Sequence, residues 1–202
     1  MAKFTTQWHR FKTVNTSPVQ PESYSTNNII KIGEGQAILS NVTDTIILED
    51  PTYIDNSETE LLFSDEIPSN AIITGIQYTF YLDADNSNNS RIDFYPRVGT
   101  TDGTQKSIFG TNIYGGATNT YPTNISDNTV GLNLDLDNVD NIQAKWNFAL
   151  ELSVNNFYIN GYDFEDANGP SPAVRLEYEL RPKVTITTNG KLSITQGKMH
   201  IV

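Results

Sequence analysis

The stretch from Ile67 to Val98 constrains the fold most, because it has the pattern of two strands joined by a polar loop. Between residues 71 and 82 the side chains alternate with the two-residue period of a β-strand. After a loop rich in Asn, Asp and Ser, apolar and polar residues alternate again up to Val98. The period predicts one strand face with Ile72, Thr74, Ile76, Tyr78, Phe80 and Leu82, opposite a face with Ile73, Gly75, Gln77, Thr79 and Tyr81. We therefore expect two half-buried antiparallel strands.

Further short apolar runs at residues 29–32, 36–40, 44–50 and 60–63 are separated by turn residues that include Gly33 and Pro51. Residues 146–154 and 174–180 alternate as clearly as the opening strand, and Leu132, Leu134 and Leu136 predict one more edge-like strand. Many short strands with turn signals between them are typical of an all-β sandwich. The chain has no cysteine, so this core must hold without disulfides. We predict an all-β, antiparallel β-sandwich of the jelly-roll type over residues 29–181.

The first 28 residues are rich in Thr, Ser, Asn and Pro, and we interpret them as an extended arm. Phe4, Trp8 and Phe11 are spaced by four and three, so they would line one side of a helix, but the threonines among them disfavour one. We expect these aromatic side chains to bind a partner, and the alternative is that they fold back onto their own domain. The first interpretation predicts that the fold survives removal of residues 1–20.

Residues 182–202 form a separate C-terminal segment with an Asn189-Gly190 pair, one of the strongest short hairpin signals. We expect a β-hairpin tail in which Leu192, Ile194 and Ile201 bind a partner. Because an isolated hairpin is marginal in water, the tail should pair with the parent sheet or extend a neighbouring subunit's sheet.

Residues 99–128 are dominated by Gly, Thr and Asn, and we expect a long excursion with one short strand. Such loops often carry binding residues, although an idle surface loop has the same composition. Four tyrosines in these Gly/Asn-rich contexts are candidates for stacking on sugar rings or for packing at an interface: Tyr114, Tyr121, Tyr158 and Tyr162.

The net charge of -11 is unevenly distributed. Residues 1–31 and 175–202 each carry +3, which leaves -17 for the middle of the chain. An acidic body argues against nucleic acid as a partner, whereas the basic ends suit an acidic protein surface. No run reaches the roughly 18 apolar residues that span a bilayer, and the first residues lack a secretory pattern, so we expect neither membrane contact nor export.

Catalytic motifs are missing from the sequence. The two histidines, His9 and His200, lie in the terminal segments, and no nucleophile elbow, phosphate loop or zinc motif is present. We therefore predict that the chain is not an enzyme, although a carboxylate pair of the kind that glycosidases use remains an alternative.

Calcium is the one cofactor for which the sequence offers ligands, in three acidic clusters. The clusters are Asp83, Asp85 and Asn89; Asp135, Asp137 and Asp140; and Asp163, Glu165 and Asp166. The first resembles the opening of a helix-loop-helix calcium loop, but Asn88 replaces its turn glycine and Phe94 its closing Glu. Solvated acidic turns are the alternative, and the candidates that we retain are Asp83, Asp85, Asp163 and Glu165.

The stretch Ile67–Ile76 reads I-P-x-x-A-x-I-x-G-I in a cysteine-free chain rich in Asn and Thr. This pattern resembles jelly-roll β-sandwich proteins of tailed-bacteriophage virions and related lectin-like surface domains. The resemblance implies a structural protein of the capsid or tail, present in many copies, assembled in the host cytoplasm and located in the virion. Its partners would be other virion proteins. The alternative is a carbohydrate-binding adhesion module, supported by calcium, whose loops hold a glycan.

Overall fold

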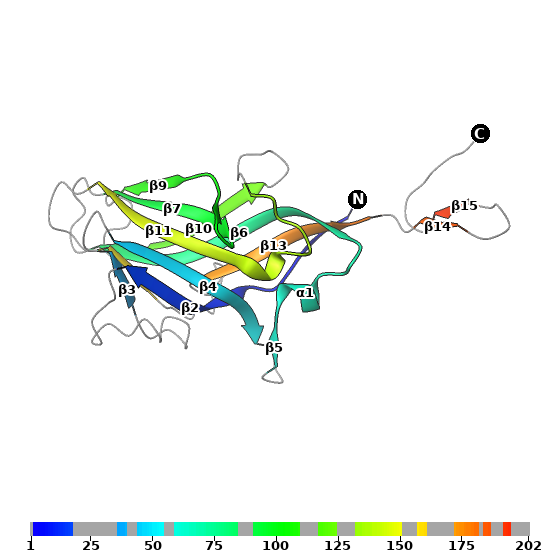
Figure 1. The fold of residues 1–202 in the computed structure, drawn as a ribbon, viewed down its shortest axis with the longest axis horizontal. Helices are drawn as coiled ribbons and strands as arrows, with labels where there is room; N and C mark the ends of the chain where they lie inside the picture. Colours follow the sequence, from blue (N-terminus) through cyan, green and yellow to red (C-terminus); the bar gives the residue numbers. More distant parts are fainter. Residues whose placement is uncertain are drawn as a thin grey trace.

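The computed structural model describes residues 2–17, 36–39, 44–54, 59–84, 91–109, 117–124, 132–150, 157–160, 172–181, 184–186 and 192–194. These parts are mostly strand (Figure 1), which confirms the all-β class. The first strands are β1 (Lys3–Thr5), β2 (His9–Ser17), β3 (Gln36–Leu39), β4 (Thr45–Ile54), β5 (Glu60–Leu61), β6 (Ala71–Ala84) and β7 (Arg91–Val98). The later strands are β8 (Thr101–Asp102), β9 (Lys106–Phe109), β10 (Ala117–Asn124), β11 (Ile142–Leu150), β12 (Phe157–Asn160), β13 (Ala173–Leu180), β14 (Val184–Ile186) and β15 (Leu192–Ile194). Two short helices are described, α1 (Phe63–Glu66) and the 3-10 helix η4 (Val139–Asn141).

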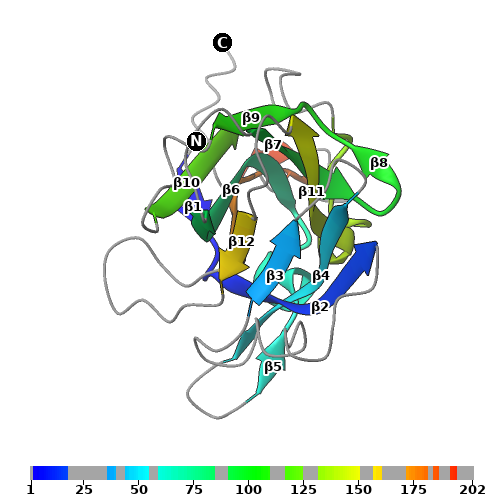
Figure 2. The same cartoon turned by 90° about the vertical axis from the view of Figure 1, so that its left-hand side faces the viewer.

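Thirteen of the described strands belong to one antiparallel sheet, which curls around a common core as a sandwich-like fold (Figure 2). In one layer, β6 pairs with β10 along one side and with β12 and β13 along the other. In the other layer, the order is β2-β4-β11-β7, and β7 also pairs with β8 and β9. Two residue pairs between β13 and β2 join the layers, so the sheet is continuous.

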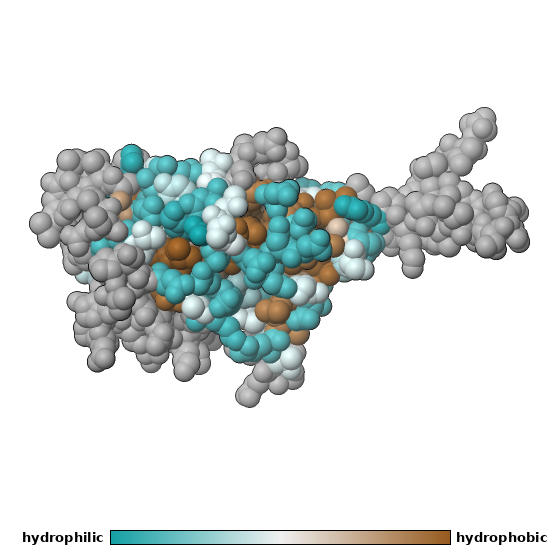
Figure 3. All heavy atoms as spheres, viewed as in Figure 1, coloured by the Kyte–Doolittle hydropathy of each residue, from teal (hydrophilic) through white to brown (hydrophobic). Residues whose placement is uncertain are grey.

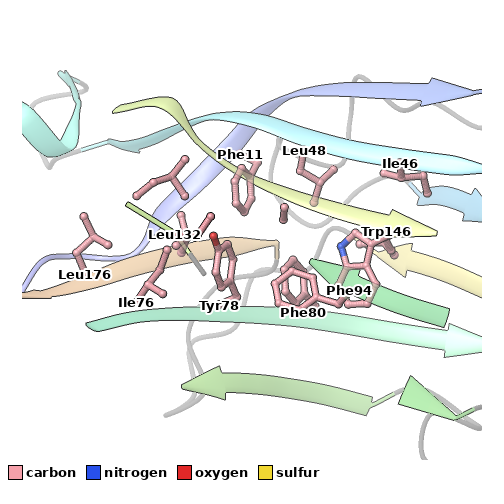
Figure 4. Close-up of a cluster of buried hydrophobic side chains, with 14 of the residues drawn as sticks. Phe11, Ile46, Leu48, Ile76, Tyr78, Phe80, Phe94, Leu132, Trp146 and Leu176 are labelled. Atoms are coloured by element: carbon pink, nitrogen blue, oxygen red, sulfur yellow. The ribbon is translucent and has the colours of Figure 1, made fainter. Parts of the chain in front are cut away.

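Aromatic side chains from both layers fill the core (Figure 4). Trp146 on β11 has its ring centroid 4.8 Å from that of Phe80 on β6 and 4.8 Å from that of Phe94 on β7. Tyr78 packs edge-on to Phe94 at 5.1 Å, and its hydroxyl donates a 3.0 Å hydrogen bond to the Gln143 carbonyl. Burial raises the pKa of Tyr78 above its ordinary value, so this hydroxyl stays a donor. Each such buried ring contributes about 1.5–3 kcal/mol to folding.

The predicted alternation of the opening strand is confirmed from Ile76 to Leu82 and is wrong before it. Ile76, Tyr78, Phe80 and Leu82 are buried, but Ile73 also points into the core while Ile72 is 37% exposed. The reason is a register shift against β13: Glu177 pairs with Gly75 and the next residue, Tyr178, pairs with Ile73. One extra residue in a strand reverses the inside and outside positions on either side of it.

The expected arm over residues 1–28 differs from the structure in its first part. β1 pairs with β13, β2 pairs with β4 over most of its length, and the amide of Thr6 donates to the Leu176 carbonyl at 3.0 Å. Phe11 is 0% exposed in the common core. Residues 3–5 and 9–17 are thus strands of the sandwich, and residues 18–28 lie outside the described residues.

Three further sequence expectations need correction. The strand β4 continues through Pro51 up to Ile54, so the prediction of a turn at Pro51 is wrong. The excursion predicted over residues 99–128 with one short strand contains the described strands β8, β9 and β10, and β10 is paired along its whole length with β6. Leu132 and Leu134 are buried as their alternation suggests, but residues 132–135 form no strand.

The predicted C-terminal hairpin is confirmed. Val184 pairs with Ile194 and Ile186 with Leu192, so β14 and β15 form a two-stranded sheet of their own. Figure 1 shows this hairpin beyond the end of β13, outside the sandwich. Among the described strands, neither β14 nor β15 pairs with the large sheet.

Candidate interaction site

A groove opens at the end of the sandwich where β6 begins and β13 ends, with a volume of about 350 Å³. Its apolar part comes from the first residues of β6 and from the segment before η4, and its rim carries two aspartates and one arginine. The lining residues are Ser69, Ala71, Ile72, Ile73, Leu134, Asp135, Leu136, Asp137 and Arg181. Elsewhere, Figure 3 shows hydrophilic and apolar residues intermixed over the face drawn there.

The helix α1 is fixed next to this groove by contacts from distant parts of the chain. The amide of Ser64 donates a 3.0 Å hydrogen bond to Asp140 of η4. On the other side, Oε2 of Glu66 lies 3.0 Å from Nε2 of His9, and its Oε1 accepts a 2.7 Å hydrogen bond from the Gln7 amide. Burial and the charge of Glu66 raise the pKa of Tyr178 above its ordinary value. These contacts make α1, η4 and the start of β2 one unit.

The groove end is acidic, whereas the tail that leaves it is basic. Residues 59–71 and 132–142 together carry six acids and no base: Glu60, Asp65, Glu66, Asp135, Asp137 and Asp140. After Glu179 the chain carries four bases and no acid: Arg181, Lys183, Lys191 and Lys198. The screening length is about 10 Å at 0.1 M salt, so opposite charges closer than this still attract each other.

The point at which the tail leaves the sandwich is held by Asn70. The amide of Arg181 donates to the Asn70 carbonyl at 2.9 Å, and the Asn70 side chain donates to the Arg181 carbonyl at 3.2 Å. Leu180 pairs with Ala71, so the tail departs from the rim of the groove itself.

A second polar cluster lies on the outer face of the β4-β11-β7 layer. Asp102 on β8 accepts hydrogen bonds from Arg97 at 2.6 Å and from Lys145 at 2.5 Å, and Nε of Arg97 donates to Gln143 at 2.7 Å. Burial opposes ionisation of Asp102, but these two cations outweigh it and hold the pKa of Asp102 below its ordinary value. The cluster ties neighbouring strands together, and its one carboxylate pairs with both cations.

The three aromatic residues of the N-terminal segment that we predict to bind a partner differ in their burial and contacts. Phe4 is 41% exposed and stacks on Tyr178 at 5.5 Å. Trp8 is partly buried, with the guanidinium of Arg175 4.5 Å from its ring centroid. Phe11 is wholly inside the core, so the interpretation of Phe11 as a partner contact is wrong, and the alternative of packing on its own domain holds for it.

The other predicted contact residues lie far from one another along the chain. Leu192 and Ile194 are in β15, and Ile201 lies outside the described residues. Tyr121 and Tyr158 belong to strands, β10 and β12, that flank β6 on opposite sides, so they do not form one loop surface. Tyr114 and Tyr162 lie outside the described residues. The carbohydrate alternative stays a prediction.

The calcium candidates are mostly on undescribed parts. Asp83 belongs to β6, but its side chain is not described, and Asp85, Asp163 and Glu165 lie outside the described residues. The cluster of Asp135, Asp137 and Asp140 is described and makes no metal site. Asp135 accepts the Asp137 amide at 3.0 Å and Asp140 accepts the Ser64 amide. In the described ranges, no three acids or histidines come together in a way that suits a metal ion.

Sequence reasoning did not anticipate the groove or the contact between His9 and Glu66. These two residues are 57 positions apart, and neither belongs to a motif. The groove depends on where the bulge in β6 places Ile72, which a simple period of two assigns to the wrong face. The sequence feature that pointed toward an interaction at this groove was the difference in charge between the acidic middle and the basic C-terminal segment.

Comparison with protein-family models and with curated protein sequences found no match. Within the described residues, no helix has the length and apolar character needed to cross a membrane.

Proposed function

We propose that this chain is a non-enzymatic structural protein of a tailed-phage virion, held to neighbouring subunits by its C-terminal segment. The observation that carries the proposal is the hairpin β14-β15, which forms its own two-stranded sheet outside the sandwich. A hairpin of this size is marginal in water unless another surface covers it. The hairpin therefore suits a segment whose partner is another protein.

Two other features support the proposal. The resemblance of residues 67–76 to virion sandwich proteins agrees with an all-β body. The acidic body, with a chain charge of -11, disfavours nucleic acid and directs the basic tail toward acidic protein surfaces. Because Phe11 lies in the core, the anchor of this proposal is the C-terminal segment, with Phe4 and Trp8 as secondary contacts.

The test is incorporation into particles. The double variant Leu192→Asp, Ile194→Asp should keep the unfolding midpoint of the sandwich and lose co-sedimentation with particles. The matched control is Thr101→Asp, Thr104→Asp, which adds the same charge at exposed positions of the body. Normal incorporation of the β15 variant would refute this function.

A further inference from the structure

We infer that the groove at the start of β6 receives the C-terminal tail of a second copy of this chain. This inference rests on the proposed role of the tail in holding subunits together, and it names the surface that the tail binds. The groove combines the exposed apolar side chain of Ile72 with two carboxylates that make no ion pair among the described residues.

The apolar part of the groove suits the alternating side chains of the tail. Ile72 is 37% exposed, and Leu136 beside it is only partly buried. The tail offers Val184, Ile186, Leu192 and Ile194 in two paired strands, and neither strand pairs with the large sheet. Burial of such side chains stabilises a contact by about 25 cal/mol per Å² of apolar surface.

The groove and the tail carry opposite charges, which favours their contact. Asp135 and Asp137 are both exposed at the rim, and neither makes an ion pair among the described residues. Arg181 lies on the same rim and offsets one of these charges, but the acids of α1 and η4 leave the surroundings negative. The tail brings Lys183, Lys191 and Lys198 without an acid. Complementary charge of this kind speeds association and selects the partner.

The occupant is a second copy because the hairpin β14-β15 of the same chain lies outside its own sandwich (Figure 1). After Arg181, β14 begins at Val184 and pairs with β15 outside the sandwich. A hairpin projecting from one copy is therefore free to meet the groove of another.

A charge-exchange experiment on the full-length chain tests the inference, with light scattering in low-salt buffer as the measurement. The groove variant is Asp137→Lys, whose side chain makes no hydrogen bond among those described, so the fold should tolerate it. The tail variant is Lys191→Glu, Lys198→Glu. Each variant alone should self-associate about tenfold more weakly than the native chain. An equimolar mixture of the two should associate again, because the altered groove then meets an altered tail.

The control for the groove variant is Thr101→Lys, Thr104→Lys, which makes the same change in net charge at exposed residues outside the groove lining. It should leave association within twofold of the native value. A native chain that stays monomeric, a mixture that fails to associate, or a control as weak as the groove variant would each overturn the inference. Particle incorporation is measured separately, so loss of the proposed function is distinguishable from loss of this contact.

Discussion

His9 shows how one side chain can fix the groove end of the molecule. Its ring is 0% exposed and stacks on Phe63 of α1 with centroids 3.8 Å apart. Its Nε2 contacts Glu66, and its Nδ1 has no hydrogen-bond partner among the described residues. A buried polar atom without a partner costs free energy, so the ring remains there because its packing and its contact with Glu66 compensate.

Replacing His9 by Ala should destabilise the fold by about 2–4 kcal/mol, because the change leaves a cavity beside Phe63 and removes the partner of Glu66. Urea unfolding followed by circular dichroism measures the loss. The control Glu66→Gln keeps an acceptor for the Gln7 amide and should cost less. If His9→Ala unfolds at the same urea concentration as the native chain, α1 is held by other contacts.

Asp102 should make stability depend on pH in one direction. Its pKa is lower in the folded protein than the ordinary value of about 3.9 in an unfolded chain. Its ionised form therefore stabilises the fold above about pH 4, and this contribution is lost as the pH falls through the folded-state pKa. Asp102→Asn should thus lower the unfolding free energy by about 1 kcal/mol at pH 7, with a smaller difference at pH 3. An equal difference at both pH values would show that charge is not the cause.

At the scale of elements, the bulge in β6 decides which residues reach the groove. Gly75 sits at this bulge with the side chain of Glu177 directly over it: a methyl group added at Gly75 would lie 2.9 Å from Oε2 of Glu177. A glycine inside a strand pattern often marks a bulge or a close approach, and here it marks both. Ile72 turns outward as a result and lines the groove.

The strand β2 makes the N-terminal segment essential to the fold. Removal of residues 2–17 takes away the partner of β4 and the buried ring of Phe11, whose loss alone is worth about 3–5 kcal/mol. We expect such a chain to lack a cooperative thermal transition in calorimetry, contrary to the expectation from sequence. Removal of residues 2–5, which deletes only β1, should leave a transition at lower temperature. A cooperative transition in the longer deletion would show that β2 is dispensable.

Strands with strong alternation were predictable from sequence, and strands with other compositions were not. The inward residues of β6, β11 and β13 follow the two-residue period, apart from the bulge. β10 reads ATNTYPTN, so it has few large apolar residues and contains a proline, and its identity depends on pairing with β6. β2 was missed because the first 28 residues are rich in Thr, Ser, Asn and Pro, which predicts an extended arm. The groove depends on contacts between segments far apart in sequence, which no local pattern records.

For the whole molecule, the separation of charge predicts how association responds to salt. Raising NaCl from about 0.1 M to 1 M shortens the screening length from about 10 Å to about 3 Å. The acidic groove end and the basic tail should therefore attract each other less, and the light-scattering mass of the native chain should fall toward the 22.5 kDa of one copy. A mass that rises with salt would instead indicate a contact dominated by apolar surface.

The pairing of Ala71 with Leu180 places the groove and the departure of the tail at one end of the same molecule. Two copies that face each other through this end can exchange tails reciprocally about a two-fold axis, because each supplies what the other lacks. Such an exchange is self-limiting: both grooves are filled and both tails are used, so a third copy finds no free site. The unit that this chain contributes to a larger assembly would then be a closed pair, and further growth would rely on the sides of the sandwich.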